Sequence, residues 1–177
     1  MNPSPHLHCF INRRRFIHRC GLFLAGVAAS SGPLRAGWKE AESLPALTGF
    51  GLEGNIPNLK GKVVYVDFWA SWCGPCKTSF PAMNRLQQEF GQKGFVIVGI
   101  SVDESPAEMH RFLEKTPASF AIVRDASHKL VSVADVSAMP TSFLVDRKGT
   151  IRYVHHGFRE KDEAALAARI TALLTQG

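Results

Sequence analysis

Hydrophobic residues along the chain form short, nearly continuous runs separated by amphipathic stretches. Two runs, Val63–Trp69 and Phe95–Val102, are rich in β-branched and aromatic residues and predict strands buried on both faces. Between them, after Cys73, apolar residues recur at spacings of three and four and predict a helix that ends near Gly91. The pattern therefore predicts a strand–helix–strand unit in the first half of the protein.

The rest of the chain continues this alternation. It predicts a helix at 106–115, a strand at 120–123, a short helix at 127–134, an antiparallel hairpin from strands at 142–145 and 151–154, and a helix at 160–174. Strand-like pieces at 46–52 and a turn at 53–55 predict an N-terminal β-hairpin extension. We expect one α/β domain, with a central mixed sheet flanked by helices on both faces.

The first 36 residues have the layout of a secretory signal peptide. Arginines at 13–15 and 19 precede a short apolar run at 21–29, and small residues follow through Gly37. The run is about half of the roughly 20 residues that span a membrane, so it favours a cleaved leader over an uncleaved anchor. Residues 12–17 are similar to a twin-arginine export signal. We predict a mature domain of residues 37–177, located in the periplasm or otherwise exported.

The net charge of +6 comes mostly from this leader. Residues 1–36 hold five of the 21 basic residues and none of the 15 acidic ones, so the remaining chain is nearly neutral. It has no basic stripe interleaved with aromatic residues, and we expect no nucleic-acid partner.

The cysteines point to redox chemistry. Two of the four, Cys9 and Cys20, lie in the leader, which leaves Cys73 and Cys76 in the mature domain and excludes a disulfide scaffold. A free cysteine is mostly protonated at neutral pH, and a helix N-terminus favours its thiolate. We therefore predict that Cys73 attacks and Cys76 resolves the mixed disulfide, with no cofactor beyond their own disulfide.

Asp67 is an acidic residue inside the first buried strand. Burial should raise its pKa, and alternation places it on one face with Tyr65 and Trp69. One interpretation makes it the acceptor of the Cys76 proton. The alternative is a structural aspartate paired with a cation such as Lys62.

Pro140, between Met139 and Thr141, opens a predicted strand. A cis peptide bond would explain its position, and a trans proline in a loop is the alternative. The histidines lack the spacing of a metal site, and we expect them to be solvated surface residues without a bound metal; they include His110, His128, His155 and His156.

The string from Val66 to Lys77, together with residues 139–141, resembles the active site of thioredoxin. The predicted hairpin, residues 99–103 and residues 143–149 are similar to the exported TlpA/ResA branch, although Ser79 stands where several ResA-type relatives carry Glu. The resemblance implies that Asp67 is the buried thioredoxin acid and that Pro140 is cis and packs against the sulfurs. It places Trp72, Gly74, Pro75, Met139, Pro140 and Thr141 at the substrate face.

The same resemblance implies a thiol:disulfide oxidoreductase. We expect it to reduce disulfides in exported proteins, for example apocytochrome c or copper-site cysteines, as a monomer supplied by a membrane electron donor. The alternatives are a disulfide-donating oxidant of the same fold and an exported copper-binding or chaperone module. Copper chaperones of the Sco kind carry three residues between their cysteines and a dedicated histidine, whereas two residues separate Cys73 from Cys76.

Overall fold

A computed structural model describes residues 37–176 of the chain. Its elements, in chain order, are η1 (Leu47–Phe50), β1 (Glu53–Gly54), β2 (Val63–Trp69), α1 (Gly74–Phe90), η2 (Gly91–Lys93), β3 (Phe95–Ser101), α2 (Pro106–Lys115), β4 (Ala121–Arg124), α3 (Lys129–Val133), β5 (Thr141–Val145), β6 (Ile151–His156) and α4 (Asp162–Thr175).

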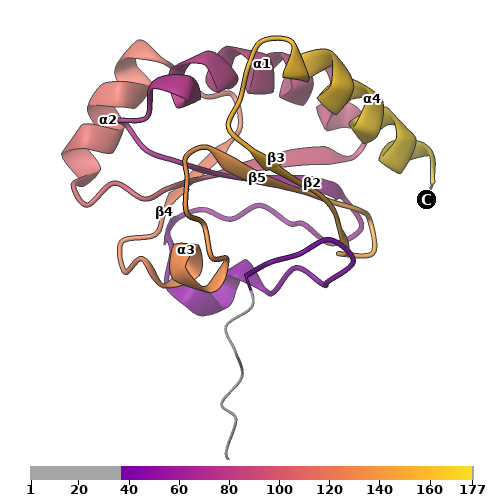
Figure 1. Cartoon of the computed structure of the whole chain (residues 1–177), viewed down its shortest axis with the longest axis horizontal. Coiled ribbons are helices and arrows are strands. Elements are labelled where there is room, and N and C mark those ends of the chain that lie inside the picture. Colours follow the sequence, from indigo (N-terminus) through magenta and orange to yellow (C-terminus); the bar gives the residue numbers. More distant parts are fainter. Residues whose placement is uncertain (1–36, 177) are drawn as a thin grey trace, which may run out of the picture. The chain divides into compact units, whose positions relative to one another are not determined.

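The strands form one six-stranded sheet in the order β1-β4-β3-β2-β5-β6. Strands β2, β3 and β4 are parallel, whereas β5 runs antiparallel to β2, β6 to β5, and β1 to β4. Helices α1, α2 and α4 cover one face of the sheet and α3 lies on the other (Figure 1). The predicted mixed sheet with helices on both faces is confirmed.

Strand β2 is buried along its whole length, as its apolar run predicted. On the face below α1, Trp69 packs edge-on against Phe80 with ring centroids 4.8 Å apart, and Phe80 packs against Phe112 of α2 at 5.0 Å. On the opposite face, Trp38 packs against Phe143 at 5.0 Å. Close packing on both faces fixes the strand that leads into Cys73.

The N-terminal hairpin extension is not formed, and that prediction is wrong. Residues Leu47–Phe50 make a short 3₁₀ helix that buries Leu47 in the core and ends at Gly51, whose φ is 66°. Within residues 46–55 a strand forms only at Glu53–Gly54, which pairs with β4 at the edge of the sheet. One helical turn buries the apolar residue that the strand prediction had placed on a hairpin face.

The predicted leader, residues 1–36, lies outside the described residues, and its cleavage and export route stay predictions. Within residues 37–176 no helix combines the length and hydrophobicity that crossing a membrane requires.

Candidate active site

A disulfide joins Cys73 and Cys76 where β2 gives way to α1. The helix begins at Gly74, so Cys73 is its N-cap residue, and Pro75 stands in the first turn. The backbone N–H of Cys76 donates a hydrogen bond to the Cys73 sulfur at 3.2 Å. A backbone N–H of the first turn, which has no partner within the helix, therefore points at this sulfur, as the sequence predicted.

The two cysteines and their neighbours differ in solvent exposure. Cys73 is 3% exposed and Cys76 is fully buried, whereas the side chain of Trp72 is 70% exposed. Gly74 and Pro75 are exposed as well. A partner would therefore approach past Trp72, Gly74 and Pro75, on the side of Cys73.

Trp72 borders two hollows of the surface. One, of about 300 Å³, is lined by Lys77 of α1 and by residues of α2 that include Arg111. The other, of about 420 Å³, is lined by Glu104 and His128 among others. Glu108 lines both hollows, so the indole stands at a surface that carries cationic and anionic side chains together.

The Met139–Pro140 peptide bond is cis, which decides between the two alternatives for this proline. Thr141, the next residue, begins β5 and lies opposite Phe68 near the end of β2. The Pro140 loop and the cysteine pair therefore lie at the same end of the central strands. Thr141 donates a hydrogen bond to the Ala138 carbonyl at 2.8 Å, which braces this loop.

Asp67 is 1% exposed, and burial raises the pKa of its carboxyl group to about 7, although a hydrogen bond from Ser142 lowers it in part. The Ser142 hydroxyl donates to Oδ1 of Asp67 at 2.9 Å. The other oxygen, Oδ2, is buried without a hydrogen-bond partner among the described residues. The neighbour is a neutral hydroxyl and not Lys62, so the expected ion-pair alternative is wrong.

Asp67 lies on the face of β2 that α1 covers. Side chains two residues apart in a strand share a face, so Asp67 lies on the same face as Trp69, whose ring packs against Phe80 of that helix. Cys76, in the first turn of α1, is fully buried against the sheet. The acid and the second cysteine therefore share the layer between β2 and α1, which suits the predicted proton transfer between them.

Asp103 is a site residue that the sequence reasoning gave only as part of a resemblance. It follows β3 and is 1% exposed. Its carboxyl group accepts hydrogen bonds from the Ser71 backbone N–H at 3.0 Å, from the Ser71 hydroxyl at 2.7 Å and from the Ser101 hydroxyl at 2.8 Å. The signal was available, because Asp103 follows a buried strand that ends at the same edge as β2.

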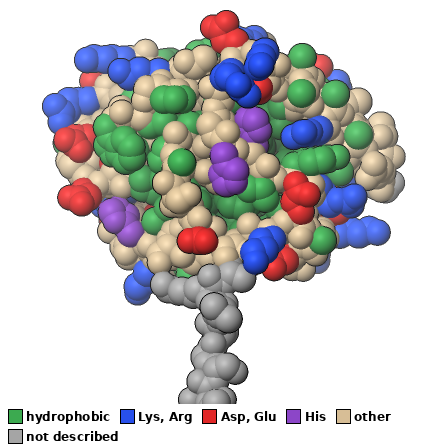
Figure 2. Space-filling model, viewed as in Figure 1, with side chains coloured by type: hydrophobic (Ala, Val, Ile, Leu, Met, Phe, Trp, Pro, Cys, Tyr) green, Lys and Arg blue, Asp and Glu red, His purple; other side chains and the backbone are tan. Residues whose placement is uncertain are grey.

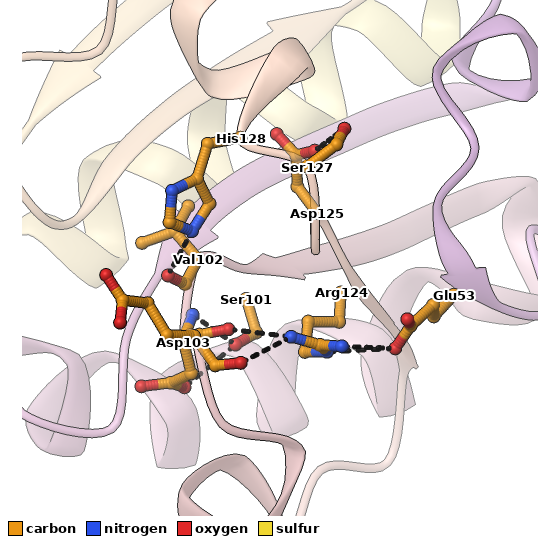
Figure 3. A network of polar contacts seen from close by, with 9 residues as sticks. Glu53, Ser101, Val102, Asp103, Arg124, Asp125, Ser127 and His128 are labelled. Atoms are coloured by element: carbon orange, nitrogen blue, oxygen red, sulfur yellow. Dashed lines mark hydrogen bonds and ion pairs between the residues drawn. The ribbon is translucent and has the colours of Figure 1, made fainter.

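Arg124 fixes the loop that carries Asp103. Its guanidinium donates to the Asp103 carbonyl at 3.1 Å and to the Glu104 carbonyl at 2.8 Å, and it forms an ion pair with Glu53 at 2.7 Å (Figure 3). The side chain is only 9% exposed. A network that starts on β4 thus reaches Ser71, the residue just before Trp72, through Asp103.

The part of the chain that the structure describes has no group of three or more His, Cys, Asp or Glu side chains arranged to hold a metal ion. His128 Nε2 instead lies 3.0 Å from the Val102 carbonyl, and Ser79 donates to the Cys76 carbonyl. Figure 2 shows one face of the molecule, on which cationic and anionic side chains both lie around hydrophobic ones. The expectations of no metal and no nucleic-acid partner stay predictions.

A mixed sheet, a cysteine pair at the start of the helix after its central strand, and a cis-proline loop at the same edge define a thioredoxin-like fold with a dithiol/disulfide site. A family model described as Redoxin matches residues 42–170. The chain belongs to this family.

Its relatives include proteins named for disulfide chemistry. The chain is 36% identical over 96 residues to the thiol-disulfide oxidoreductase ResA of Bacillus subtilis, and 32% identical over 113 residues to that of Bacillus cereus. These matches cover 54% and 64% of this chain, and 54% and 65% of the respective relatives, less than two thirds of their length. A crystal structure described as a thiol:disulfide interchange protein DsbE, from Chlorobium tepidum, is 39% identical, with a TM-score of 0.72 over 77% of this chain and 99% of that one.

Proposed function

We propose that the protein is an exported thiol:disulfide oxidoreductase that reduces disulfides in other exported proteins. The observation that carries the proposal is the Cys73–Cys76 disulfide at the start of α1, with a backbone N–H directed at the Cys73 sulfur. That donor stabilises a thiolate at Cys73 once the disulfide is reduced. The similarity to ResA and DsbE proteins supports the reaction class, and the pattern of residues 1–36 supports export.

The reaction runs in two exchanges. The Cys73 thiolate attacks one sulfur of the substrate disulfide, which forms a mixed disulfide and releases the other substrate sulfur as a thiolate. Asp67 then takes the Cys76 proton, and Cys76 attacks Cys73, which releases the second substrate thiolate. Two electrons pass to the substrate and the Cys73–Cys76 disulfide remains. A membrane dithiol donor returns two electrons and restores the reduced pair.

The geometry suits a protein substrate. Trp72, Gly74 and Pro75 are exposed beside Cys73, and the hollows next to Trp72 offer room for a chain segment on either side of a substrate cysteine. We infer that the substrates are cysteine pairs in extended or unfolded segments, such as those of apocytochrome c or of copper sites before metal loading. We propose that the protein acts as a monomer.

The test is the reduction of a protein disulfide. Insulin is reduced by dithiothreitol with and without the full chain, and the precipitation of the released B chain is followed by turbidity. We expect the protein to shorten the lag several-fold and Cys73→Ser to leave the uncatalysed rate. Equal rates for the native protein and this variant would contradict the proposal.

A further inference from the structure

Three polar side chains form a row across the sheet below α1 and α4. Asp67 of β2 lies directly opposite Ser142 of β5, and Ser142 lies directly opposite His155 of β6. Residues opposite each other in antiparallel strands place their side chains on the same face. The row therefore leads sideways from the buried acid toward the edge strand.

Two hydrogen bonds link Tyr65, Ser142 and Asp67 in that order. The Tyr65 hydroxyl donates to Ser142 Oγ at 2.7 Å, and Ser142 donates to Asp67 Oδ1 at 2.9 Å, with all three groups buried. Tyr65 precedes Asp67 by two residues, so it lies roughly 7 Å farther from the cysteine end of the strand. Burial, together with the nearby Asp67, raises the pKa of Tyr65, which keeps this hydroxyl protonated as a donor.

The side chains of Tyr65 and Ser142 line a cavity of about 120 Å³ below α4. Its lining includes Tyr65, Ser142, His155, Asp162 and Arg169. A cavity that holds water needs about 10–15 Å³ and two to four polar partners per molecule. This cavity has the volume, and its wall combines polar side chains with apolar ones such as Leu144 and Phe158. At its rim, the side chains of His155 and Asp162 are 32% and 18% exposed, and His155 Nε2 lies 3.6 Å from Asp162 Oδ2 without a hydrogen bond among residues 37–176.

The opposite side of Asp67 is closed. Its neighbour on β3 is Gly99, and a Cβ atom there would lie 2.9 Å from Ile122 and 3.2 Å from the Trp69 indole nitrogen. Among the described residues, the side-chain atoms nearest to Gly99 belong to Ile122, Phe120 and Trp69, and none is a hydroxyl or a charged group. The charged groups of α4, Asp162 and Arg169, lie at the cavity on the side of Tyr65.

We propose that Ser142 and Tyr65 form a hydroxyl relay that carries protons between Asp67 and the cavity below α4. The inference rests on the proposed role of Asp67 as the proton partner of Cys76. It gives Asp67 a route to solvent that does not pass the disulfide, so the acid can change its protonation state while a substrate covers Cys73.

The proton balance is as follows. When a dithiol reduces the Cys73–Cys76 disulfide, one of its thiolates forms a bond to the Cys73 sulfur as the Cys73–Cys76 bond breaks. Cys76 leaves as a thiolate and takes a proton from Asp67, which becomes a carboxylate. A cavity water protonates Tyr65 as the Tyr65 proton moves to Ser142 and the Ser142 proton moves to Asp67 Oδ1. Solvent returns the proton to the cavity water. When the protein reduces a substrate, the same steps run in reverse and Asp67 releases its proton outward.

The test follows the Asp67 proton itself. The full chain in the disulfide form, at a pH near 5 where Asp67 is protonated, is mixed with D₂O, and the infrared C=O band of the buried carboxylic acid is recorded against time. Asp67→Asn identifies the band by its loss. Because no thiol substrate is present, the result does not depend on whether the protein catalyses exchange.

We expect Tyr65→Phe and Ser142→Ala to slow the deuterium shift of this band at least tenfold, and Ser142→Thr, which keeps a hydroxyl, to restore it. Tyr153→Phe is the matched control, because Tyr153 lines the same cavity without bonding to Ser142, and it should exchange as the native protein does. Native exchange rates in both Tyr65→Phe and Ser142→Ala would overturn the relay. Equal slowing in Tyr153→Phe would overturn it as well, since a general change of the cavity would then be the cause.

Discussion

Asp103 accepts hydrogen bonds from two groups of Ser71: the backbone N–H, 3.0 Å and 3.1 Å from its two carboxylate oxygens, and the hydroxyl, at 2.7 Å. The two residues follow neighbouring parallel strands, since Trp69 at the end of β2 lies opposite Ser101 at the end of β3. Ser71 precedes the exposed Trp72 and Cys73, the proposed attacking residue. The buried Asp103 therefore holds the loop that presents the reactive pair.

We predict that Asp103→Ala lowers the free energy of unfolding by about 2–4 kcal/mol, because the part-buried Ser71 donors and the buried Ser101 hydroxyl lose their acceptor. Ser71→Ala removes only the hydroxyl bond and should lower it by about 1 kcal/mol. Urea unfolding of the disulfide form measures both. Equal effects in the two variants would show that Asp103 does not act through the Ser71 backbone.

Asp67 should make the folded protein less stable as the pH rises. Burial raises its pKa from 3.8 to about 7, so between these values the folded state binds more protons than the unfolded state. The unfolding free energy therefore falls as pH rises through this window. Relative to the native protein, Asp67→Asn should gain about 2–4 kcal/mol between pH 4 and pH 8, at about 1.4 kcal/mol per pKa unit.

This comparison is made by urea unfolding of both disulfide forms at the two pH values. Titrations shared by the two proteins cancel in the difference, which isolates Asp67. A difference that does not change with pH would mean that Asp67 titrates near its ordinary pKa in the fold.

The same carboxyl group should shape the rate at which a dithiol reduces the disulfide. Cys76 leaves as a thiolate, and protonated Asp67 can supply its proton. Since the Asp67 pKa is about 7, the rate constant per reductant thiolate should fall as pH rises through 7. Stopped-flow tryptophan fluorescence should show this fall in the native protein and a flat profile in Asp67→Asn. Matching profiles would remove Asp67 from the proton transfer.

The two cysteines should differ when one is replaced. In Cys76→Ser, Cys73 still attacks but no thiol resolves the product, so mixed disulfides with substrate proteins should accumulate. With Cys9 and Cys20 replaced by serine in both variants, Cys73→Ser is the matched control and should trap at least tenfold less, because Cys76 is fully buried. Non-reducing electrophoresis after incubation with a denatured disulfide protein measures the adducts. Comparable trapping by both variants would contradict the assignment of Cys73 as the attacking residue.

Local patterns were enough to predict the centre of the fold. The apolar run of β2 and the proline after Cys73 are local signals, and the structure has the strand and the helix start that they predict. The N-terminal segment was mispredicted because its few apolar residues suit a short strand and a helical turn alike. Burial of Leu47 in the core, which depends on distant residues, selected the turn.

Local sequence patterns could not predict the hydrogen bonds that join Tyr65, Ser142 and Asp67. Ser142 and Asp67 are 75 residues apart in the chain, and they meet because β5 pairs with β2 in one particular register. A shift of one residue would turn Ser142 to the other face of the sheet. The composition of β5 contains no signal for that register, so Ser142 and Tyr65 became site residues only in the folded structure.

The most direct test of the proposed reductase is the reduction potential of the Cys73–Cys76 pair in the full chain. Cys9 and Cys20 are replaced by serine, and the protein is equilibrated with glutathione and dithiothreitol buffers of known reduction potential. The fraction of alkylated cysteine is then measured at each potential. We predict a potential near or below that of thioredoxin, about −270 mV, which requires an electron supply and favours substrate reduction. A potential near about −120 mV, as in strong oxidants, would make the protein a disulfide donor and contradict the proposed direction of electron flow.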